Sequence, residues 1–467
     1  MTDQELIQPI IAKARAAQRI FDTYTQAQVD HIVEGVSYAG YSNAETLAQL
    51  AYEGTRLGNY ADKVTKVRRK TMGTMMDLKH AKSVGVIDVD EARGVTTIAK
   101  PMGVIAALLP STNASATPVN NIMITLKGRN AVILAPHPKG EAACAEVVRL
   151  ARQVLRELGA PEDLVQMLSL KAADKYAGKA RASALMAVCD YALITAGPAN
   201  VDLGYRSGTP THGVGVGNAP VIIDDSADLD AAIPKIVASK TFDNATSCSS
   251  ENALVIMASR YDETLAALQA HGGYLTNEAE KDQLEAAIWP GGRLSRAVVA
   301  QSAATIAAEA NLGEMAQAAK FFIVEEERVG RDYLFSGEKL TVVLTVYRAN
   351  TFDEAVDTVT GILDYMGKGH SCGIHTSNDE HIEQLAHAAP VSTVLVNQPH
   401  CYNNGGGFDN GLDFTLSMGA GTWGRNDSCE NLTYKHFLNY TYLARQIPER
   451  VPTEKELWGE YLATRAA

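Results

Sequence analysis

The stretch VIAALLPSTNASATPVNNIMITLKGRNAVILA, residues 104–135, indicates the fold of this chain. It begins with a short apolar run, Val104–Leu109, of the kind found in strands that are buried on both faces. A polar turn follows, and residues 118–127 then have the composition of a helix. A second apolar run, Ala131–Ala135, predicts another buried strand. Strand, helix and strand in this order predict two parallel strands joined by a crossover helix.

The same alternation continues along the chain. Residues 3–80 read mainly as helix, and residues 84–100 read as two strands around a bend, which predicts a projecting hairpin. Further strands are expected at 164–168, 191–195, 253–257, 320–324, 341–347 and 393–396, and further helices at 141–158 and 172–186. We therefore predict an α/β fold with two doubly wound parallel-sheet domains, the second of which begins near residue 219.

Composition and charge argue against several classes of function. The chain has 467 residues and a formal net charge of −12. A nucleic-acid-binding protein should carry a basic surface, so we expect no nucleic-acid partner. No apolar run reaches the roughly 18 residues that cross a bilayer, so we expect no membrane partner. Six cysteines without a C-x-x-C pair predict reduced thiols in the cytoplasm and no metal site.

One cysteine, Cys248, stands among small polar residues in KTFDNATSCSSENALVI, residues 240–256. A lone cysteine is more often a small buried hydrophobic residue than a nucleophile. Other motifs of the sequence must therefore show which of the two Cys248 is. PSTNASATP, residues 110–118, follows a strand and opens a helix, so its backbone N–H groups and the Asn113 amide can hold an oxyanion. ITAGPANV (194–201) is a small-residue turn that lets a phosphate or ribose approach, and HGVGVGNAP (212–220) is a glycine-rich passage.

Taken in order, these segments resemble the aldehyde dehydrogenase superfamily. They are most similar to its coenzyme-A-acylating branch, and within it to the acylating succinate-semialdehyde and sulfoacetaldehyde dehydrogenases. The other matching motifs are LKGRNAVILAPHPK, RSGTPTHGVGVGNAPVIID, GHSCGIHT and GTWGRNDSCENLTYKH. The resemblance implies a nucleotide-binding domain at 1–216 that carries the hairpin 84–100, and a catalytic domain at 217–415. It also implies that the C-terminal segment, 416–467, returns to the cofactor domain and the subunit interface.

The resemblance places Cys248 at the position of the nucleophile. Its thiolate would attack the aldehyde carbon, while Asn113 and the Cys248 backbone N–H hold the oxyanion. Hydride would then leave for the nicotinamide and give a thioacyl-enzyme. The implied cofactor-binding residues are Ser111, His137, Lys139, Thr195, Gly197, Gly215 and Glu338. For Glu338 the alternative is a solvated charge beside Lys339.

One departure from the superfamily predicts the reaction. Val214 stands where hydrolytic members carry a glutamate that activates water, at the same spacing before Cys248. Bulk water has a pKa of about 15.7 and a free thiol about 8.5, so hydroxide is harder to form than thiolate by about 10 kcal/mol. Without a base to activate water, the acyl group on Cys248 should be transferred to a thiol. We therefore expect CoA as co-substrate and acyl-CoA as product.

His370, in GHSCGIHT, matches a histidine of the acylating branch, and it would assist thiol deprotonation or position the carbonyl group. The alternative is a structural histidine in a turn. Together with His400 and the nearby cysteines it lacks the spacing of a metal site. After the strand that ends at Ala135, the sequence PHPKG offers no acid to repel a 2′-phosphate, and it places Lys139 close by. NADP is therefore permitted as well as NAD.

Polar residues around the nucleophile predict the substrate class. Thr246 and Ser247 precede Cys248, where relatives usually have bulky apolar residues. His400 and Asn403 lie in the polar loop HCYNNGGGFDNG, residues 400–411, which by resemblance borders the aldehyde entrance. Such groups suit a small aldehyde with a polar or anionic tail. Succinate semialdehyde and sulfoacetaldehyde are favoured over acetaldehyde and propionaldehyde.

Two other functions remain open from the sequence. A hydrolytic aldehyde dehydrogenase would have to recruit a different base. A catalytically silent scaffold protein would use the hairpin 84–100 and the C-terminal tail as interfaces. By analogy with the family, the hairpin pairs subunits into a homodimer or a homotetramer.

Overall fold

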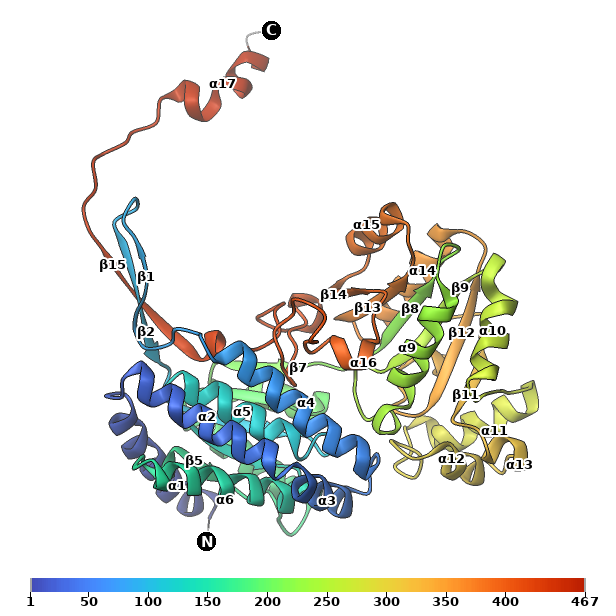
Figure 1. Ribbon diagram of the computed structural model, residues 1–467, viewed down its shortest axis with the longest axis horizontal. Coiled ribbons are helices and arrows are strands. Elements are labelled where there is room, and N and C mark those ends of the chain that lie inside the picture. The colour runs from blue at the N-terminus through green and yellow to red at the C-terminus, as the bar shows by residue number, and fades with distance from the viewer. Residues whose placement is uncertain (1, 466–467) are drawn as a thin grey trace.

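The computed structural model describes residues 2–465, whose strands form three sheets (Figure 1). The first contains, in order across it, β5 (Val165–Met167), β4 (Ala131–Pro136), β3 (Val104–Leu109), β6 (Tyr191–Thr195) and β7 (Thr211–Val214). The second contains β10 (Gly273–Leu275), β11 (Phe321–Glu325), β12 (Val343–Ala349), β9 (Glu251–Met257), β8 (Ala219–Ile223), β13 (Gly369–His375) and β14 (Val391–Val396). Neighbouring strands in both sheets run parallel. The predicted α/β fold with parallel sheets is confirmed.

The first sheet is enclosed by the helices of the first half of the chain. These are α1 (Asp3–Phe21), α2 (Gln26–Ser42), α3 (Ala44–Thr55), α4 (Tyr60–Leu78), α5 (Ala116–Lys127), α6 (Glu141–Glu157), α7 (Lys175–Met186) and α8 (Pro198–Tyr205). Every residue of α5 is buried, because this helix packs against both α2 and α4 as well as against β3 and β4. The strand–helix–strand stretch of residues 104–135 thus forms the core of this half.

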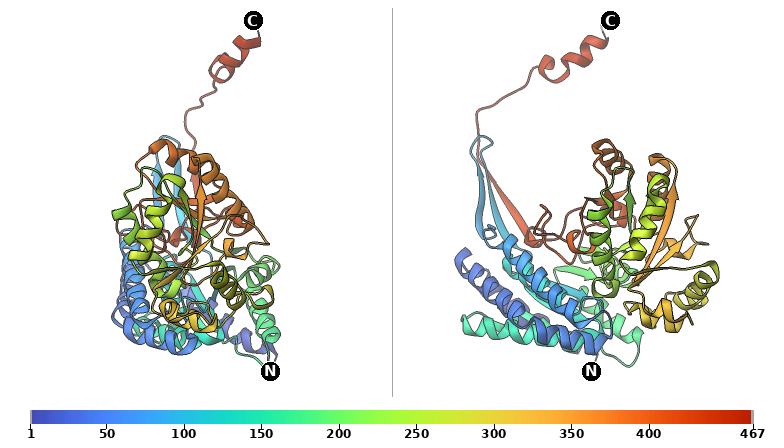
Figure 2. Two further views of the ribbon diagram at one scale, coloured as in Figure 1. Left: turned by 90° about the vertical axis from the view of Figure 1, so that its right-hand side faces the viewer. Right: turned by 45° about the vertical axis from the view of Figure 1, so that its right-hand side comes forward.

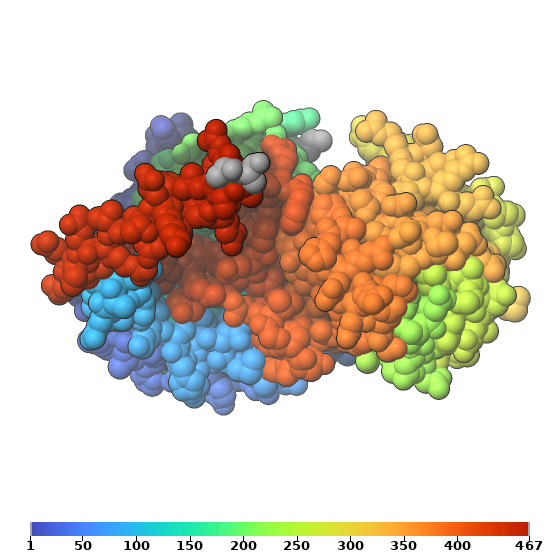
Figure 3. Space-filling view, turned by 90° about the horizontal axis from the view of Figure 1, so that it is seen from above, coloured from blue at the N-terminus to red at the C-terminus, as the bar shows by residue number. Residues whose placement is uncertain are grey.

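The second sheet has its own helices and its own hydrophobic core. The helices are α9 (Leu229–Thr241), α10 (Tyr261–Ala270), α11 (Glu278–Ile288), α12 (Ala303–Glu309), α13 (Glu314–Gln317), α14 (Phe352–Tyr365), α15 (Asp379–Ala388) and the short α16 (His400–Asn403). Seen from above, the two halves lie side by side (Figure 3). The domain limits at 216 and 415 remain predictions, and the first of them falls between β7 and β8.

The third sheet stands away from the body of the molecule (Figures 1 and 2). β1 (Gly85–Asp90) and β2 (Val95–Pro101) pair antiparallel, and β15 (Leu438–Ala444) pairs antiparallel with the other edge of β2. The C-terminal part of the chain therefore returns to the first half. Beyond β15 the chain is extended and ends in α17 (Glu454–Arg465), which has no buried residue. No helix within residues 2–465 is long and apolar enough to cross a membrane.

One element differs from its prediction in a way that matters for function. The structural alternative for His370 places GHSCGIHT in a turn, but seven of its residues form β13, and all seven are buried. β13 pairs with the edge strand β14 along most of its length and with β8 at Gly373–His375. His370 is therefore held on a buried strand, one strand in from the edge of the second sheet.

Candidate active site

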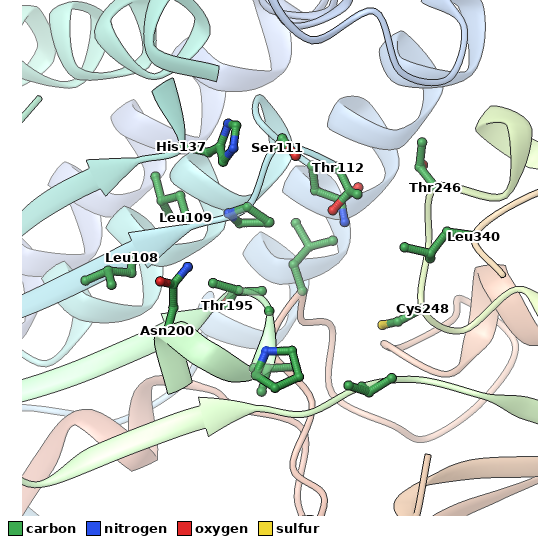
Figure 4. A pocket seen from close by; sticks show the side chains of 18 of the residues that line it. Leu108, Leu109, Ser111, Thr112, His137, Thr195, Asn200, Thr246, Cys248 and Leu340 are labelled. Carbon is green, nitrogen blue, oxygen red and sulfur yellow. The ribbon is translucent and has the colours of Figure 1, made fainter. Parts of the chain in front are cut away.

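A cavity of about 840 Å³ is lined by both halves of the chain (Figure 4). The first half contributes residues that follow the carboxyl ends of β3, β4, β6 and β7, and the second half contributes the loop Thr246–Ser249. Carboxyl ends of parallel strands meet at one edge of a sheet, which is where ligands bind in open α/β folds. The cavity volume lies within the range of about 300–1,000 Å³ that small-molecule sites occupy.

Cys248 lies in the loop between α9 and β9 and is half-buried, with its sulfur pointing into the cavity (Figure 4). Just before it, Asp243, Asn244 and Ala245 adopt left-handed conformations with φ of 51°, 51° and 57°. Asp and Asn tolerate this conformation better than most residues. Opposite the loop, a Cβ at Gly217 would collide with the carbonyl oxygen of Cys248. Gly217 therefore allows the loop of Cys248 to pack closely against the segment between β7 and β8.

Asn113, on the loop between β3 and α5, lines the same cavity. Its Oδ1 accepts a hydrogen bond of 3.0 Å from the Nζ of Lys66, on α4. Because an ammonium group only donates, this contact fixes which end of the amide faces Lys66. The NH₂ end is left on the other side and can donate to an oxyanion, as predicted for Asn113.

Lys66 belongs to a buried ion cluster that joins the two halves. Its Nζ lies 2.6 Å from Asp243 Oδ2 and 2.9 Å from Thr246 Oγ1, and Lys63 Nζ lies 3.1 Å from the same carboxylate oxygen. Burial alone would raise the pKa of Asp243, but Lys66 and Lys63 outweigh it and lower that pKa. Burial lowers the pKa of Lys63 to about 8.

His370 lies directly beside Cys248, the predicted nucleophile. Its Nε2 is 3.2 Å from Cys248 Sγ, and its Nδ1 is 2.7 Å from Ser371 Oγ. Ser371 Oγ is also 2.9 Å from Nε2 of His400. Burial lowers the pKa of His370 to about 4 and that of His400 to about 3, so both imidazoles are neutral at pH 7. Cys248, His370, Ser371 and His400 thus form one hydrogen-bonded chain.

The donors and acceptors along this row of four side chains follow from its last member, His400. Within residues 2–465, Nδ1 of His400 is buried and has no hydrogen-bond partner. A buried N–H without an acceptor is more costly than an unused lone pair, so the His400 proton belongs on Nε2, facing Ser371. The Ser371 hydroxyl then donates to His370 Nδ1, and the His370 proton lies on Nε2, facing Cys248. In this arrangement the His370 Nε2–H faces the sulfur, to which it can donate once Cys248 becomes a thiolate.

The acidity of the thiol is set by burial and by Glu338. Burial, with a further contribution from Glu338, raises the pKa of Cys248 to about 12. Burial also raises the pKa of Glu338 to about 8, and its Oε1 accepts a hydrogen bond of 3.2 Å from the Gly217 N–H. Glu338 is not a solvated charge beside Lys339, because Lys339 is fully buried and donates to the Phe335 carbonyl at 2.6 Å. Without ligands, the site holds Cys248 as a thiol at neutral pH.

Most of the predicted site residues come together in the cavity. Those that line it are Ser111, Asn113, His137, Thr195, Gly197, Gly215, Thr246, Ser247, Cys248 and Glu338. Lys139 does not line it and lies exposed beside His137. The His400 side chain turns to Ser371, and the Asn403 amide donates to Gln398 and Asp409, so neither side chain reaches the cavity.

The Thr246 hydroxyl does not face a substrate. It donates to Asp243 Oδ2 at 2.8 Å and accepts from Lys66, and Thr246 is 1% exposed. The Ser247 hydroxyl is 2.9 Å from Ser249 Oγ, and Ser247 remains half-buried at the cavity wall. Thr246 thus shapes the nucleophile loop, whereas Ser247 still has hydrogen-bonding capacity.

The cations of α4 and Arg296 belong to the site but were not predicted from the sequence. Lys70 lines the cavity, and Lys66 and Arg69 lie behind it. A signal was present, because Lys63, Lys66 and Lys70 recur at intervals of three and four on one face of a helix whose same face carries Val67. Arg296 lies on the cavity wall, and with burial and Lys139 it lowers the pKa of His137.

Comparison with known proteins shows the family. The aldehyde dehydrogenase family matches residues 1–288. A sulfoacetaldehyde dehydrogenase (acylating) of Cupriavidus necator is 46% identical over 98% of this chain and 93% of the relative. A succinate-semialdehyde dehydrogenase (acetylating) of Clostridium kluyveri is 35% identical over 98% of this chain and 100% of the relative. The crystal structure of an acetylating aldehyde dehydrogenase from Geobacillus thermoglucosidasius has a TM-score of 0.91 and 32% identity, covering 97% of this chain and 98% of that one.

The chain belongs to the aldehyde dehydrogenase family. The similarity to acylating members that the motifs predicted is confirmed. The cavity of this aldehyde dehydrogenase also fits a nicotinamide dinucleotide. A Cβ at Gly197 would meet no atom within 4 Å, so a pyrophosphate group can approach the backbone closely at this glycine. Val214, at the end of β7, is buried in the cavity wall and offers no proton acceptor there.

Proposed function

We propose that this aldehyde dehydrogenase is CoA-dependent and acylating, and that it converts a small anionic aldehyde, CoA and NADP or NAD into an acyl-CoA. The observation that carries the proposal is a cysteine nucleophile paired with His370 in a cavity where Val214 stands in place of the water-activating base. The names of the relatives from Cupriavidus necator and Clostridium kluyveri support acylation. Those names also support sulfoacetaldehyde and succinate semialdehyde as the candidate substrates.

The chain's own residues account for the steps at the carbonyl carbon. The Cys248 thiol loses its proton to water in the cavity, and His370 Nε2–H stabilises the resulting thiolate as it attacks. Asn113 donates its amide N–H to the oxyanion that forms. The nicotinamide cofactor, when bound, accepts the hydride, and CoA supplies the thiol. Collapse of the second tetrahedral intermediate expels the Cys248 thiolate, which again receives the His370 hydrogen bond. Removing one oxyanion donor costs about 10²–10³-fold in kcat in a comparable site.

Either nucleotide cofactor is compatible with the residues at the adenosine end. His137 and Arg296 line the cavity there, and Lys139 lies beside His137. The positive charges of Arg296 and Lys139 favour a 2′-phosphate, so we expect NADP to be used at least as well as NAD. Initial rates with the two cofactors at equal concentrations test this, and a strong preference for NAD would contradict it.

Two alternative functions are separated by one experiment. Among the residues that line the cavity, the carboxylates are Asp174 and Glu338, so a hydrolytic enzyme would have to use Glu338 as its base. The test is a panel of aldehydes assayed with and without CoA, with product analysis. The proposal requires acyl-CoA, and free acid formed rapidly without CoA selects the hydrolytic enzyme instead. A scaffold protein would show no oxidation of any aldehyde, and Cys248→Ala would leave its cellular function intact.

We also propose that the enzyme is a cytoplasmic homodimer or homotetramer. The six cysteines lie unpaired in the structure, in keeping with a reducing compartment. The three-stranded sheet and α17 project from the body, and apolar side chains on them are exposed, among them Tyr442, Trp458 and Tyr461. Exposed apolar surface of this kind marks an interaction site, and a second copy of the chain is the proposed partner.

A further inference from the structure

A small side chamber adjoins the active-site cavity next to the nucleophile. Its volume is about 30 Å³, enough for about two water molecules. It shares Asn113 and Ser247 with the main cavity, so it lies next to both the oxyanion donor and the nucleophile. Three cations of α4 line it, namely Lys66, Arg69 and Lys70, and no carboxylate is among its lining residues. This concentration of positive charge stands out in a chain whose net charge is −12.

The hydrogen bonds of the two lysines differ. An ammonium group has three N–H donors. Lys66 uses all three N–H donors, in hydrogen bonds to Asn113, Asp243 and Thr246. Lys70 donates to the Gly405 carbonyl at 2.6 Å and, at 3.4 Å, to that of Gly406, so one donor remains. Lys66 is therefore a structural cation, whereas Lys70 retains a donor for a ligand.

Arg69 has the most unused hydrogen-bonding capacity. Within residues 2–465 it forms one long hydrogen bond, 3.4 Å to Asn403 Oδ1, and no ion pair, and its buried Nε has no partner. The guanidinium carbon lies 5.6 Å from the ring centroid of Tyr402 and 4.9 Å from that of Phe408. These rings orient the planar group without neutralising its charge. A guanidinium held in this way is suited to bind a carboxylate or a sulfonate group.

We propose that the side chamber binds the anionic tail of the aldehyde, with Arg69 and Lys70 donating to its sulfonate or carboxylate oxygens. This inference rests on the proposed function and assigns the residues that select its substrate. The shared Asn113 and Ser247 connect the chamber to the carbonyl carbon over a short distance, so a tail a few bonds long reaches both. Burial and the neighbouring cations Arg69 and Lys66 lower the pKa of Lys70 to about 7, so an anion in the chamber would favour its charged form.

Substitution of Arg69 tests the inference by substrate choice. We expect Arg69→Gln to lower the ratio of kcat/KM for sulfoacetaldehyde to that for propionaldehyde by about 30-fold, chiefly through KM, which corresponds to about 2 kcal/mol. Lys70→Met should lower the ratio in the same direction, and Arg69→Lys should restore part of it. The matched control is Arg68→Gln, because Arg68 is the next residue of α4 but faces outward and pairs with Glu45 at 2.9 Å. Succinate semialdehyde in the same assay shows whether the chamber selects a sulfonate or a carboxylate.

A second experiment does not depend on turnover. Ethanesulfonate should slow the alkylation of Cys248 by iodoacetamide in the wild-type chain and in Arg68→Gln, but not in Arg69→Gln, and uncharged ethyl methyl sulfone should not slow it in any of them. An unchanged substrate ratio and equal protection in Arg69→Gln would overturn the chamber assignment. Protection that depends on Arg69, in a protein that oxidises no aldehyde in the presence of CoA, would instead overturn the proposed function and leave the anion site standing.

Discussion

Replacing the central carboxylate of the buried ion cluster should destabilise the enzyme strongly. Asp243 is fully buried and accepts hydrogen bonds from Lys63, Lys66, the Thr246 hydroxyl and the Asn59 backbone N–H. Asp243→Asn keeps the shape and tolerates the left-handed φ of 51°, but it removes the carboxylate charge that both lysines contact. The substitution thus removes a charge and one hydrogen-bond acceptor, with little change in packing.

The magnitude follows from how each lysine can respond. Removing one partner of a buried ion pair costs about 3–5 kcal/mol of unfolding free energy. This cost applies to Lys66, which stays charged and loses its partner. Lys63 can lose its proton instead, because its pKa is already lowered to about 8, so its share at pH 7 is limited to about one pKa unit, or about 1.4 kcal/mol. We expect a total loss of about 3–6 kcal/mol at pH 7. For a unit of 150–250 residues this lowers Tm by roughly 6–24 °C.

The difference in stability between the wild type and the variant should depend on pH. In the variant the folded lysines bind a proton less tightly than the unfolded ones, so raising the pH stabilises the folded variant. With a pKa of about 8, the wild-type Lys63 is mostly protonated at pH 7 and about half protonated at pH 8. The difference in unfolding free energy between the two proteins should therefore narrow by about 1 kcal/mol. Thermal and urea denaturation at pH 7 and 8 measure this, with the exposed Asp357→Asn as control. A loss below about 1 kcal/mol at pH 7, equal to that of the control, would refute the reasoning.

Three further predictions concern the reaction and the assembly. Val214→Glu should produce free acid from the aldehyde without CoA, measured by chromatography of the products; acyl-CoA as the sole product would contradict the role given to Val214. Glu338→Gln should speed alkylation of Cys248 at pH 9 but hardly at pH 6, because the Glu338 carboxyl is charged only above its pKa of about 8 and then opposes the thiolate; equal rates at pH 9 would show that Glu338 does not act on the sulfur. Deleting residues 446–467 should reduce the oligomer measured by light scattering, and an unchanged mass would exclude the tail from the interface.

The parallel sheets and most of the cavity were predictable because their signals are local. Val104–Leu109 and Tyr191–Thr195 are short apolar runs, and their bounds in the structure are those of the prediction. The turns after these strands carry Asn113 and Gly197, and a parallel sheet brings such turns to one edge whatever lies between them in sequence. Cys248 was recognisable by its small polar neighbours and by its resemblance to the family.

The rest of the site depends on contacts between distant parts of the chain. The alternative reading placed His370 in a turn, yet it lies on β13, which pairs with β14 on both sides of this residue. Residue spacing alone does not show that His400 points to Ser371, nor that the Thr246 hydroxyl is used inside the protein. Arg69 comes from a helix more than 170 positions before Cys248 in the sequence. Only the packing of α4 against the second half places its charge beside the nucleophile.

The position of Lys66 connects the stability of the enzyme with its chemistry. One ammonium group contacts Asn113 in the first half and both Asp243 and Thr246 in the second. Any sliding of the two halves that separates the oxyanion donor from the nucleophile loop must break a buried, charge-assisted hydrogen bond. Lys66 thereby holds Asn113 and the loop of Cys248 in register, and all three of its N–H donors are used for this within the protein. A variant such as Lys66→Met should therefore lose kcat for charged and uncharged aldehydes alike, whereas Arg69→Gln should lose the distinction between them.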